Sequence, residues 1–362
     1  MTLEKLAGHH LIMGLSGPTL SAEERRFLVD YDIAGVILFP RNLNSPQQIY
    51  DLTAEIQSLS SKTVSGLPLF VSIDMEGGRV ARLKEPFTQW PPLRQLGIGD
   101  SAQLAFDMSL AMGVELGAVG INLDFAPVLD ILTNPENTVI GDRAVSDTSE
   151  RVMKLGSALV RGYLKSGIIP CGKHFPGHGN TLVDSHEDLP VEQTDLERLR
   201  AVELKPFLRA FRSGLEMVMS SHILFPRIDP EWPVTLSEIF LRRILREELR
   251  YRHLVISDDL DMKALSNHYD PRLVPVRALQ AGIDLLLYCN DPSSPERAID
   301  AICKAVVDGW LDRRQLEESF GRIEQFKREH PGAKPRPAKE TALRLVGAAE
   351  HLELAATIRR YT

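Results

Sequence analysis

The chain has 362 residues, of which 43% are hydrophobic and 25% charged, a composition typical of a globular protein with a large buried core. Its formal net charge of −7 and its lack of a long basic run argue against binding to nucleic acid or to an anionic membrane surface. Residues 1–17 lack a signal-peptide pattern, and no uncharged apolar stretch approaches the ~18 residues of a membrane span, so we expect a soluble, cytoplasmic protein.

The cysteines also bear on the environment of the protein. Cys171, Cys289 and Cys303 form an odd set without CxxC spacing, which argues against a disulfide framework and against a zinc site. We interpret them as small buried hydrophobic residues in a reducing compartment.

Eight short apolar runs, rich in Val, Ile, Leu and Phe, recur along the chain. They occupy residues 11–15, 35–39, 69–74, 121–125, 168–174, 217–222, 254–258 and 284–289. Between them lie segments with helical periodicity, at residues 46–60, 102–117, 150–166, 195–213 and 236–250. Continuous apolar runs that alternate with helices are typical of parallel strands buried on both faces.

Eight such units predict an α/β fold of the closed (β/α)8, TIM-barrel type, which takes about 250 residues or more as one domain. A doubly wound open sheet is the alternative, but the first turn, Gly17-Pro18-Thr19, lacks a GxGxxG fingerprint. We expect a single catalytic barrel over residues 1–310. Residues 311–362, with helical patterns around a Pro-rich linker at 330–337, form a C-terminal helical extension packed on or trailing the barrel.

Polar residues stand at the ends of five of the predicted strands. These endings include Asp74, Asp124, Lys173 and His174, Ser221 and His222, and Ser257, Asp258 and Asp259. Active sites of such barrels are built at the carboxyl ends of the strands, and buried charges are costly unless they are paired or used. The set therefore indicates one active site at the mouth of the barrel.

The segment 171–189 is the richest in such residues, and its glycines and proline predict a loop. One interpretation is a metal site built from His174, His178, Asp184 and His186, but the spacing matches no familiar ligand pattern, so no metal is expected. The other is an acid–base pair. The Asp184 carboxylate, two residues away, can orient the His186 imidazole and stabilise its protonated form.

Three cations are candidates for holding a substrate. Lys173 stands at a strand end, and Arg82 and Arg143 can reach the same mouth, where fixed cations and carboxylates make directional bonds to vicinal sugar hydroxyls. For each arginine, a surface salt bridge is equally compatible with the sequence. Trp90 and Trp232 could stack on a sugar ring, but lone tryptophans more often pack in a core, so we leave them out of the site.

These motifs resemble those of the bacterial β-N-acetylglucosaminidases of glycoside hydrolase family three. The densest match is Lys173-His174-Phe175-Pro176-Gly177-His178-Gly179 with Asp184-Ser185-His186. Similar blocks, in the same order, lie at residues 38–42, 74–80, 140–144 and 257–262, so the resemblance covers about residues 8–310.

The resemblance implies a role for each matching residue. Asp258 would be the nucleophile, His186 the general acid/base and Asp184 its partner. The sugar would be held by Asp74, Arg82, Arg143, Lys173 and His174. The first aspartate of the Asp258-Asp259 pair is chosen because the family places its nucleophile directly after the Ser/Thr, here Ser257.

The implied reaction is retaining hydrolysis through a covalent glycosyl-enzyme, without a cofactor. The implied substrate is a peptidoglycan-derived muropeptide with terminal N-acetylglucosamine linked to anhydro-muramic acid. Met75 and His253 depart from the family pattern, which usually has Gln and Gly there, and put only local fit in doubt. The oligomeric state is not predicted.

Three alternatives stay open. A two-domain β-glucosidase of the same family would take its acid/base from outside the barrel and lacks the Asp-Ser-His loop. A phosphorylase would use phosphate in place of water. A sugar sensor of the same fold would need a broken catalytic set, whereas Asp258, His186 and Asp184 are all present.

Overall fold

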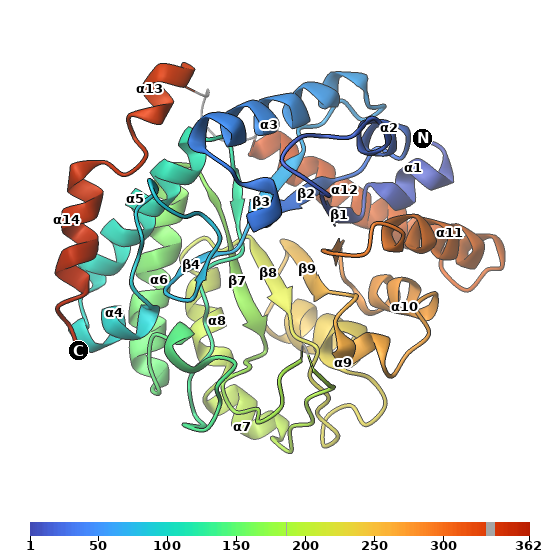
Figure 1. Cartoon of the computed structure of the whole chain (residues 1–362). Coiled ribbons are helices and arrows are strands. Elements are labelled where there is room, and N and C mark those ends of the chain that lie inside the picture. Colours follow the sequence, from blue (N-terminus) through green and yellow to red (C-terminus); the bar gives the residue numbers. More distant parts are fainter. Residues whose placement is uncertain (186, 331–336) are drawn as a thin grey trace.

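The computed structural model describes residues 1–185, 187–330 and 337–362. Eight parallel strands close into a barrel in chain order, with β10 pairing back onto β1 (Figure 1). The barrel strands are β1 (Leu11–Gly14), β2 (Gly35–Leu38), β3 (Phe70–Ile73), β6 (Leu123–Asp124), β7 (Ile169–Phe175), β8 (Met217–Ser220), β9 (Leu254–Asp259) and β10 (Leu285–Tyr288). Each lies within one of the eight predicted runs or extends it by one residue, so the predicted barrel is confirmed.

A helix follows each barrel strand and packs on the outside of the barrel. These helices are α2 (Ala22–Asp30), α3 (Pro46–Ser58), α5 (Ala102–Ala118), α6 (Ser149–Ser166), α8 (Leu204–Phe211), the π-helix η5 (Ile239–Glu248), α10 (Leu273–Ala281) and α11 (Ser294–Val307). Shorter helices are α1 (Leu3–Gly8), α4 (Leu93–Gly99), α7 (Leu196–Ala201), α9 (Lys263–Ser266) and the 3-10 turns η1 (Pro40–Asn42), η2 (Leu59–Lys62), η3 (Gly141–Arg143) and η4 (Val234–Leu236). The pattern at 195–213 thus predicts one helix where the structure has two, α7 and α8.

Local chemistry sets several of these boundaries. Ser21 and Glu24 form a reciprocal capping box at the start of α2, so two otherwise unpaired backbone N–H groups are satisfied. α6 ends at Gly167, whose φ of 93° is a left-handed conformation that glycine adopts without steric cost. These caps position the helices that lead into β2 and β7.

A second, smaller sheet follows β3 directly. There β4 (Met75–Gly77) and β5 (Val80–Ala81) pair as a small antiparallel hairpin outside the barrel sheet. The sequence gives no prediction of this hairpin, because its strands are too short for a period to be read. We call residues 74–82 the hairpin segment, since it carries several of the polar residues described below.

The extension beyond residue 310 packs against the barrel at two places (Figure 1). α12 (Arg313–Glu329) contributes Ile323 and Phe326 to the same apolar cluster as the inward-facing side chains of the strands. Lys327 donates to the carbonyl of Ala34, which precedes β2, so α12 covers the amino-terminal end of the barrel. α13 (Lys339–Leu343) lies against α3, and α14 (Ala349–Ile358) against α5 and α4.

Two of the three cysteines fit the expectation and one differs in part. Cys171 and Cys289 are buried and Cys303 is half-buried, and all three are free thiols.

Among the described residues, each helix is too short or too polar to span a lipid bilayer.

Candidate active site

The ends of the barrel strands enclose a cavity of about 170 Å³. Its lining includes Asp74, Glu76, Arg82, Arg143, Lys173, His174, His178, Ser185, Asp258 and Asp259. The five predicted sugar-binding residues and the predicted nucleophile therefore meet in one cavity, although they come from the hairpin segment, η3, β7 and β9. This is the carboxyl end of the barrel, where the fold places active sites.

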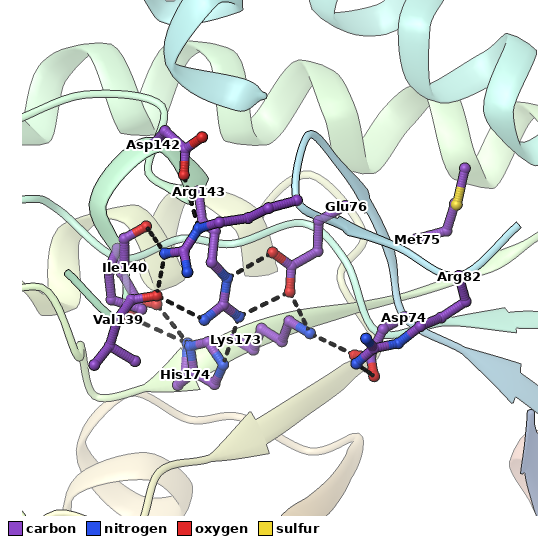
Figure 2. A network of polar contacts seen from close by, with 12 residues as sticks. Asp74, Met75, Glu76, Arg82, Val139, Ile140, Asp142, Arg143, Lys173 and His174 are labelled. Atoms are coloured by element: carbon purple, nitrogen blue, oxygen red, sulfur yellow. Dashed lines mark hydrogen bonds and ion pairs between the residues drawn. The ribbon is translucent and has the colours of Figure 1, made fainter. Parts of the chain in front are cut away.

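Lys173 is the centre of a charged network at the base of this cavity (Figure 2). Its ammonium lies 2.7 Å from Asp74 Oδ1 and 2.7 Å from Glu76 Oε1. The side chain is 3% exposed, so its charge is withdrawn from water and balanced by the two carboxylates. Both carboxylates come from the hairpin segment, so this segment supplies both acidic partners of Lys173.

Arg143 approaches Glu76 from the other side (Figure 2). Its Nε donates to Glu76 Oε2 and its Nη2 to Glu76 Oε1, each over 2.8 Å. This is the bidentate arrangement that a guanidinium favours. Nη2 also lies 3.4 Å from Nε2 of His174. Glu76 thus positions two of the predicted sugar-binding cations at once.

The network keeps its members charged. Burial would raise the pKa of Glu76, but Arg143 and Lys173 outweigh it and hold this pKa well below its ordinary value. In the same way, Lys173 and Arg82 outweigh burial and lower the pKa of Asp74. Burial would lower the pKa of Lys173, but Asp74 and Glu76 raise it. The cavity therefore offers fixed carboxylates and cations to hydroxyl groups.

Arg82 stands nearer to solvent. Its Nη2 donates to Asp74 Oδ2 over 3.2 Å, its side chain is 30% exposed, and its guanidinium lies 5.4 Å from the centre of the Phe39 ring. This is more than the surface salt bridge that the sequence alone allowed, because its partner Asp74 is itself bonded to Lys173.

His174 is oriented from behind by Asp130. Its Nδ1 lies 2.7 Å from Asp130 Oδ2, while Asp130 Oδ1 accepts the backbone N–H groups of His174 and His178. A carboxylate at Nδ1 directs the other ring nitrogen, Nε2, toward Arg143 and the cavity. His178 instead bonds Thr181 through Nδ1, and burial lowers the pKa of His178 to about 4.

Asp258 lies near the end of β9 and lines the cavity. Its Oδ1 accepts the backbone N–H of Asp259 over 2.8 Å. Burial would raise the pKa of Asp258, but His222, His174 and this N–H bond outweigh it and lower the pKa. Asp258 is half-buried, and an ionised carboxylate that faces the cavity is what a nucleophile at this position requires.

Its neighbour Asp259 has the opposite character. Asp259 accepts the backbone N–H groups of Asp261 and Cys289, and burial together with the carboxylates of Asp261 and Asp258 raises the pKa of Asp259 to about 7. The structure therefore separates two adjacent aspartates into an ionised one and one that is largely protonated below pH 7.

The loop that follows β7 returns to the cavity. Ser185 lines it and accepts the backbone N–H of Ala264 over 3.1 Å. The Asp184 carbonyl accepts the N–H groups of Glu187 and Asp188. The predicted acid/base, His186, lies outside the described residues, so the predicted Asp184–His186 pair stays a prediction.

Sequence reasoning assigned no role to several residues of the site. Glu76 pairs with Arg143, and Asp130 with His174. His222 is the residue that lowers the pKa of Asp258 most. His222 bonds Thr235 Oγ1 and lies 3.0 Å from the carbonyl of Asp259. The polar strand ending at Ser221 and His222 was the one available signal for it.

The residues that we left out or that depart from the family pattern do not line the cavity. Trp90 is buried, and Trp232 packs against Tyr269 with ring centres 5.5 Å apart. Met75 is buried in β4, and its N–H donates to Asp124. His253 precedes β9 at the amino-terminal end of the barrel. Within the described ranges, no group of three His, Cys, Asp or Glu residues is arranged to hold a metal ion.

Comparison with known proteins finds the same family that the sequence motifs resemble. The model of the "Glycosyl hydrolase family 3 N terminal domain" matches residues 3–326. A curated relative from Idiomarina loihiensis, named "Beta-hexosaminidase", is 38% identical over 325 residues, which are 88% of this chain and 96% of the relative.

Two solved structures extend the likeness to three dimensions. A family 3 β-N-acetylglucosaminidase from Paenibacillus sp. str. FPU-7 is 38% identical, with a TM-score of 0.92 over 99% of this chain and 68% of that one. NagZ from Neisseria gonorrhoeae in complex with N-trifluoroacetyl-D-glucosamine is 31% identical, with a TM-score of 0.77 over 97% of each chain. The chain belongs to glycosyl hydrolase family 3 and is a glycosidase of the β-hexosaminidase type.

Proposed function

We propose that this glycosidase is a retaining exo-β-N-acetylglucosaminidase that removes terminal N-acetylglucosamine from muropeptides derived from peptidoglycan. The observation that carries the proposal is the meeting of Asp258 with Asp74, Arg82, Arg143, Lys173 and His174 in one cavity. The muropeptide rests on the likeness of the motifs, and the N-acetylglucosamine unit is further supported by the glucosamine derivative bound to NagZ.

In the first step, a carboxylate oxygen of Asp258 attacks the anomeric carbon. The bond from this carbon to the leaving oxygen breaks, and the His186 imidazolium donates a proton to that oxygen. The product is a covalent glycosyl-enzyme. The lowered pKa of Asp258 supports this role, because the attacking carboxylate must be ionised.

In the second step, neutral His186 takes a proton from water as the water oxygen attacks the anomeric carbon. The bond to Asp258 breaks and its carboxylate is restored. Two displacements at one carbon retain the β configuration. Asp184 orients the His186 ring and stabilises its charged form. A histidine thus takes the place of the second carboxylate that most retaining glycosidases use.

The sugar is held by the charged network. Asp74 and Lys173 bond to hydroxyl groups on one edge of the ring, and Arg82, Arg143 and His174 supply further donors. Because the network charges are already paired with each other, binding requires little reorganisation of the site.

The test uses an aryl β-N-acetylglucosaminide that releases a chromogenic phenol. We expect turnover by the wild type, a β-configured first product by NMR, and loss of turnover in Asp258→Ala. Mass spectrometry after reaction with a fluorinated glycoside should find the sugar on Asp258. A first product with the α configuration, or full activity in Asp258→Ala, would overturn the mechanism.

Phosphorolysis is separated by the products. A hydrolase releases free N-acetylglucosamine at the same rate with and without phosphate, whereas a phosphorylase gives the 1-phosphate when phosphate is added. The natural substrate is then tested by comparing N-acetylglucosaminyl-anhydromuramyl peptides with N-acetylglucosamine disaccharides as competing substrates.

A further inference from the structure

The C-terminal helix α14 and the active-site cavity are linked by a loop that the mechanism does not use. This loop, residues 83–92, follows the hairpin segment and leads into α4. It returns to the hairpin through a bond of 2.9 Å from the N–H of Gly78 to the carbonyl of Trp90. A β-carbon at Gly78 would collide with Pro92, so loop and hairpin lie in close contact.

The middle of the loop is fixed by a buried carboxylate on α5. Glu115, which is 3% exposed, accepts the backbone N–H of Thr88 over 2.9 Å and its hydroxyl over 2.5 Å. Nδ1 of His351, on α14, lies 2.8 Å from the same Glu115 carboxylate and donates to it. His351 is 7% exposed, so α14 supplies a buried partner to the residue that holds the loop.

Two further contacts join the C-terminal segment to the loop. Arg359 donates to the carbonyl of Gln89, and a β-carbon at Gly347 would collide with the carbonyl of Pro86. Gly347 has a φ of 63°, so a larger residue would be strained there as well. The loop is therefore enclosed between α5 on one side and residues 347–359 on the other.

A buried carboxylate such as Glu115 holds its position only while its hydrogen-bond partners are present. Without His351, the Glu115 carboxylate loses a hydrogen bond inside the protein and the loop loses one of its supports. A displacement of the loop would reach the hairpin segment through the bond between the Gly78 N–H and the Trp90 carbonyl. That segment carries Asp74 and Arg82.

We propose that α14 is part of the substrate-binding machinery, with His351, Glu115 and Arg359 acting as positioning residues for Asp74 and Arg82. The proposal rests on the proposed assignment of Asp74 and Arg82 to the sugar. It gives a function to a segment that lies beyond the family match, which ends at residue 326.

The experiment compares full-length variants on the aryl β-N-acetylglucosaminide and measures KM, kcat and the inhibition constant of free N-acetylglucosamine. In His351→Leu we expect KM and the inhibition constant to rise about tenfold, because that is roughly the loss of affinity when one hydrogen bond from the sugar to a charged group is weakened. His351→Asn should restore both values, since the asparagine amide nitrogen occupies the place of Nδ1 and can donate to Glu115.

Arg322→Ala is the matched control. It removes an ion pair with Asp284, 2.8 Å long, at the amino-terminal end of the barrel. It should lower the melting temperature without raising KM, which separates positioning from general loss of stability. Should His351→Leu fail to fold, Arg359→Ala replaces an exposed residue and gives the same measurement on a folded protein.

Unchanged KM and inhibition constant in folded His351→Leu, or in Arg359→Ala if that variant is used, would overturn the proposal. So would an equal rise in KM in Arg322→Ala. If Asp258→Ala abolishes turnover while the His351 variants bind the sugar normally, only this inference fails. If Asp258→Ala stays active, the proposed mechanism fails instead.

Discussion

Nζ of Lys173 lies 2.7 Å from Oε1 of Glu76, and the two side chains are 3% and 1% exposed. One buried carboxylate therefore balances Lys173 and, through a bidentate pair, Arg143. Removing one partner of such a set leaves charge uncompensated inside the protein, whereas removing a partner at the surface does not.

We predict that Glu76→Gln lowers the free energy of unfolding by about 3 kcal/mol and raises KM, because Lys173 and Arg143 keep their charges and lose their shared partner. Urea unfolding measures the first effect and steady-state kinetics the second. The control is Glu248→Gln, which breaks a pair with Arg200 whose side chains are 36% and 50% exposed. A loss of stability as large in the control as in Glu76→Gln would contradict the prediction.

The raised pKa of Asp259 predicts how the stability of the protein depends on pH. Its pKa is about 7 in the folded protein, against an ordinary value of 3.8, so the folded state holds a proton that the unfolded state releases first. Asp259 therefore makes stability fall as pH rises from about 4 to about 7, by up to about 1.4 kcal/mol per pH unit. Below this range Asp259 is protonated in both the folded and the unfolded state, so it adds no dependence of stability on pH.

The variant Asp259→Asn should lose this dependence while its side-chain oxygen still accepts the N–H bonds from Asp261 and Cys289. The difference in unfolding free energy between variant and wild type is measured at pH 4.5 and pH 7. We expect the variant to gain relative stability at the higher pH. A difference that is the same at both pH values would argue against a raised pKa.

A substitution at Asp130 tests how the orientation and tautomer of the His174 ring are set. In Asp130→Asn the amide N–H faces Nδ1 of His174, which moves the ring proton to Nε2, opposite the Arg143 donor at 3.4 Å. We expect KM to rise about tenfold, since a hydrogen bond to a charged group contributes about 1.5–3 kcal/mol. Nitrogen NMR of the imidazole reports the tautomer, and an unchanged tautomer with unchanged KM would be the opposing result.

The proposed acid role of His186 predicts a dependence on the leaving group. His186→Ala should slow hydrolysis by about 100- to 10,000-fold when the leaving alcohol needs a proton, and far less for an acidic phenol. Rates are measured across a series of aryl glycosides of different phenol pKa. A uniform loss across the series would remove His186 from proton transfer.

Asp184→Asn should move the alkaline limb of the kcat/KM profile to lower pH. A nearby carboxylate stabilises the imidazolium, so its removal lowers the pKa of His186. An alkaline limb that stays where the wild type has it would separate Asp184 from His186.

The sequence by itself determined the barrel and the location of its active end. Strands buried on both faces need continuous apolar runs, and a polar residue at the end of such a run stands out against them, as Asp74, Lys173 and Asp258 do. These signals are local, so they can be read without the fold. The matching motifs then assigned a family to the chain.

Only the tertiary structure decided how these residues are paired. Asp74 and Lys173 meet across 99 positions of the chain. No local pattern marks Glu76 as a partner of Lys173, or Asp130 as the partner of His174. The difference between Asp258 and Asp259 has the same origin. The two are identical and adjacent in sequence, and only their buried surroundings lower the pKa of one and raise that of the other. The contact between α14 and the loop before α4 likewise depends on burial and distance, which a sequence period does not contain.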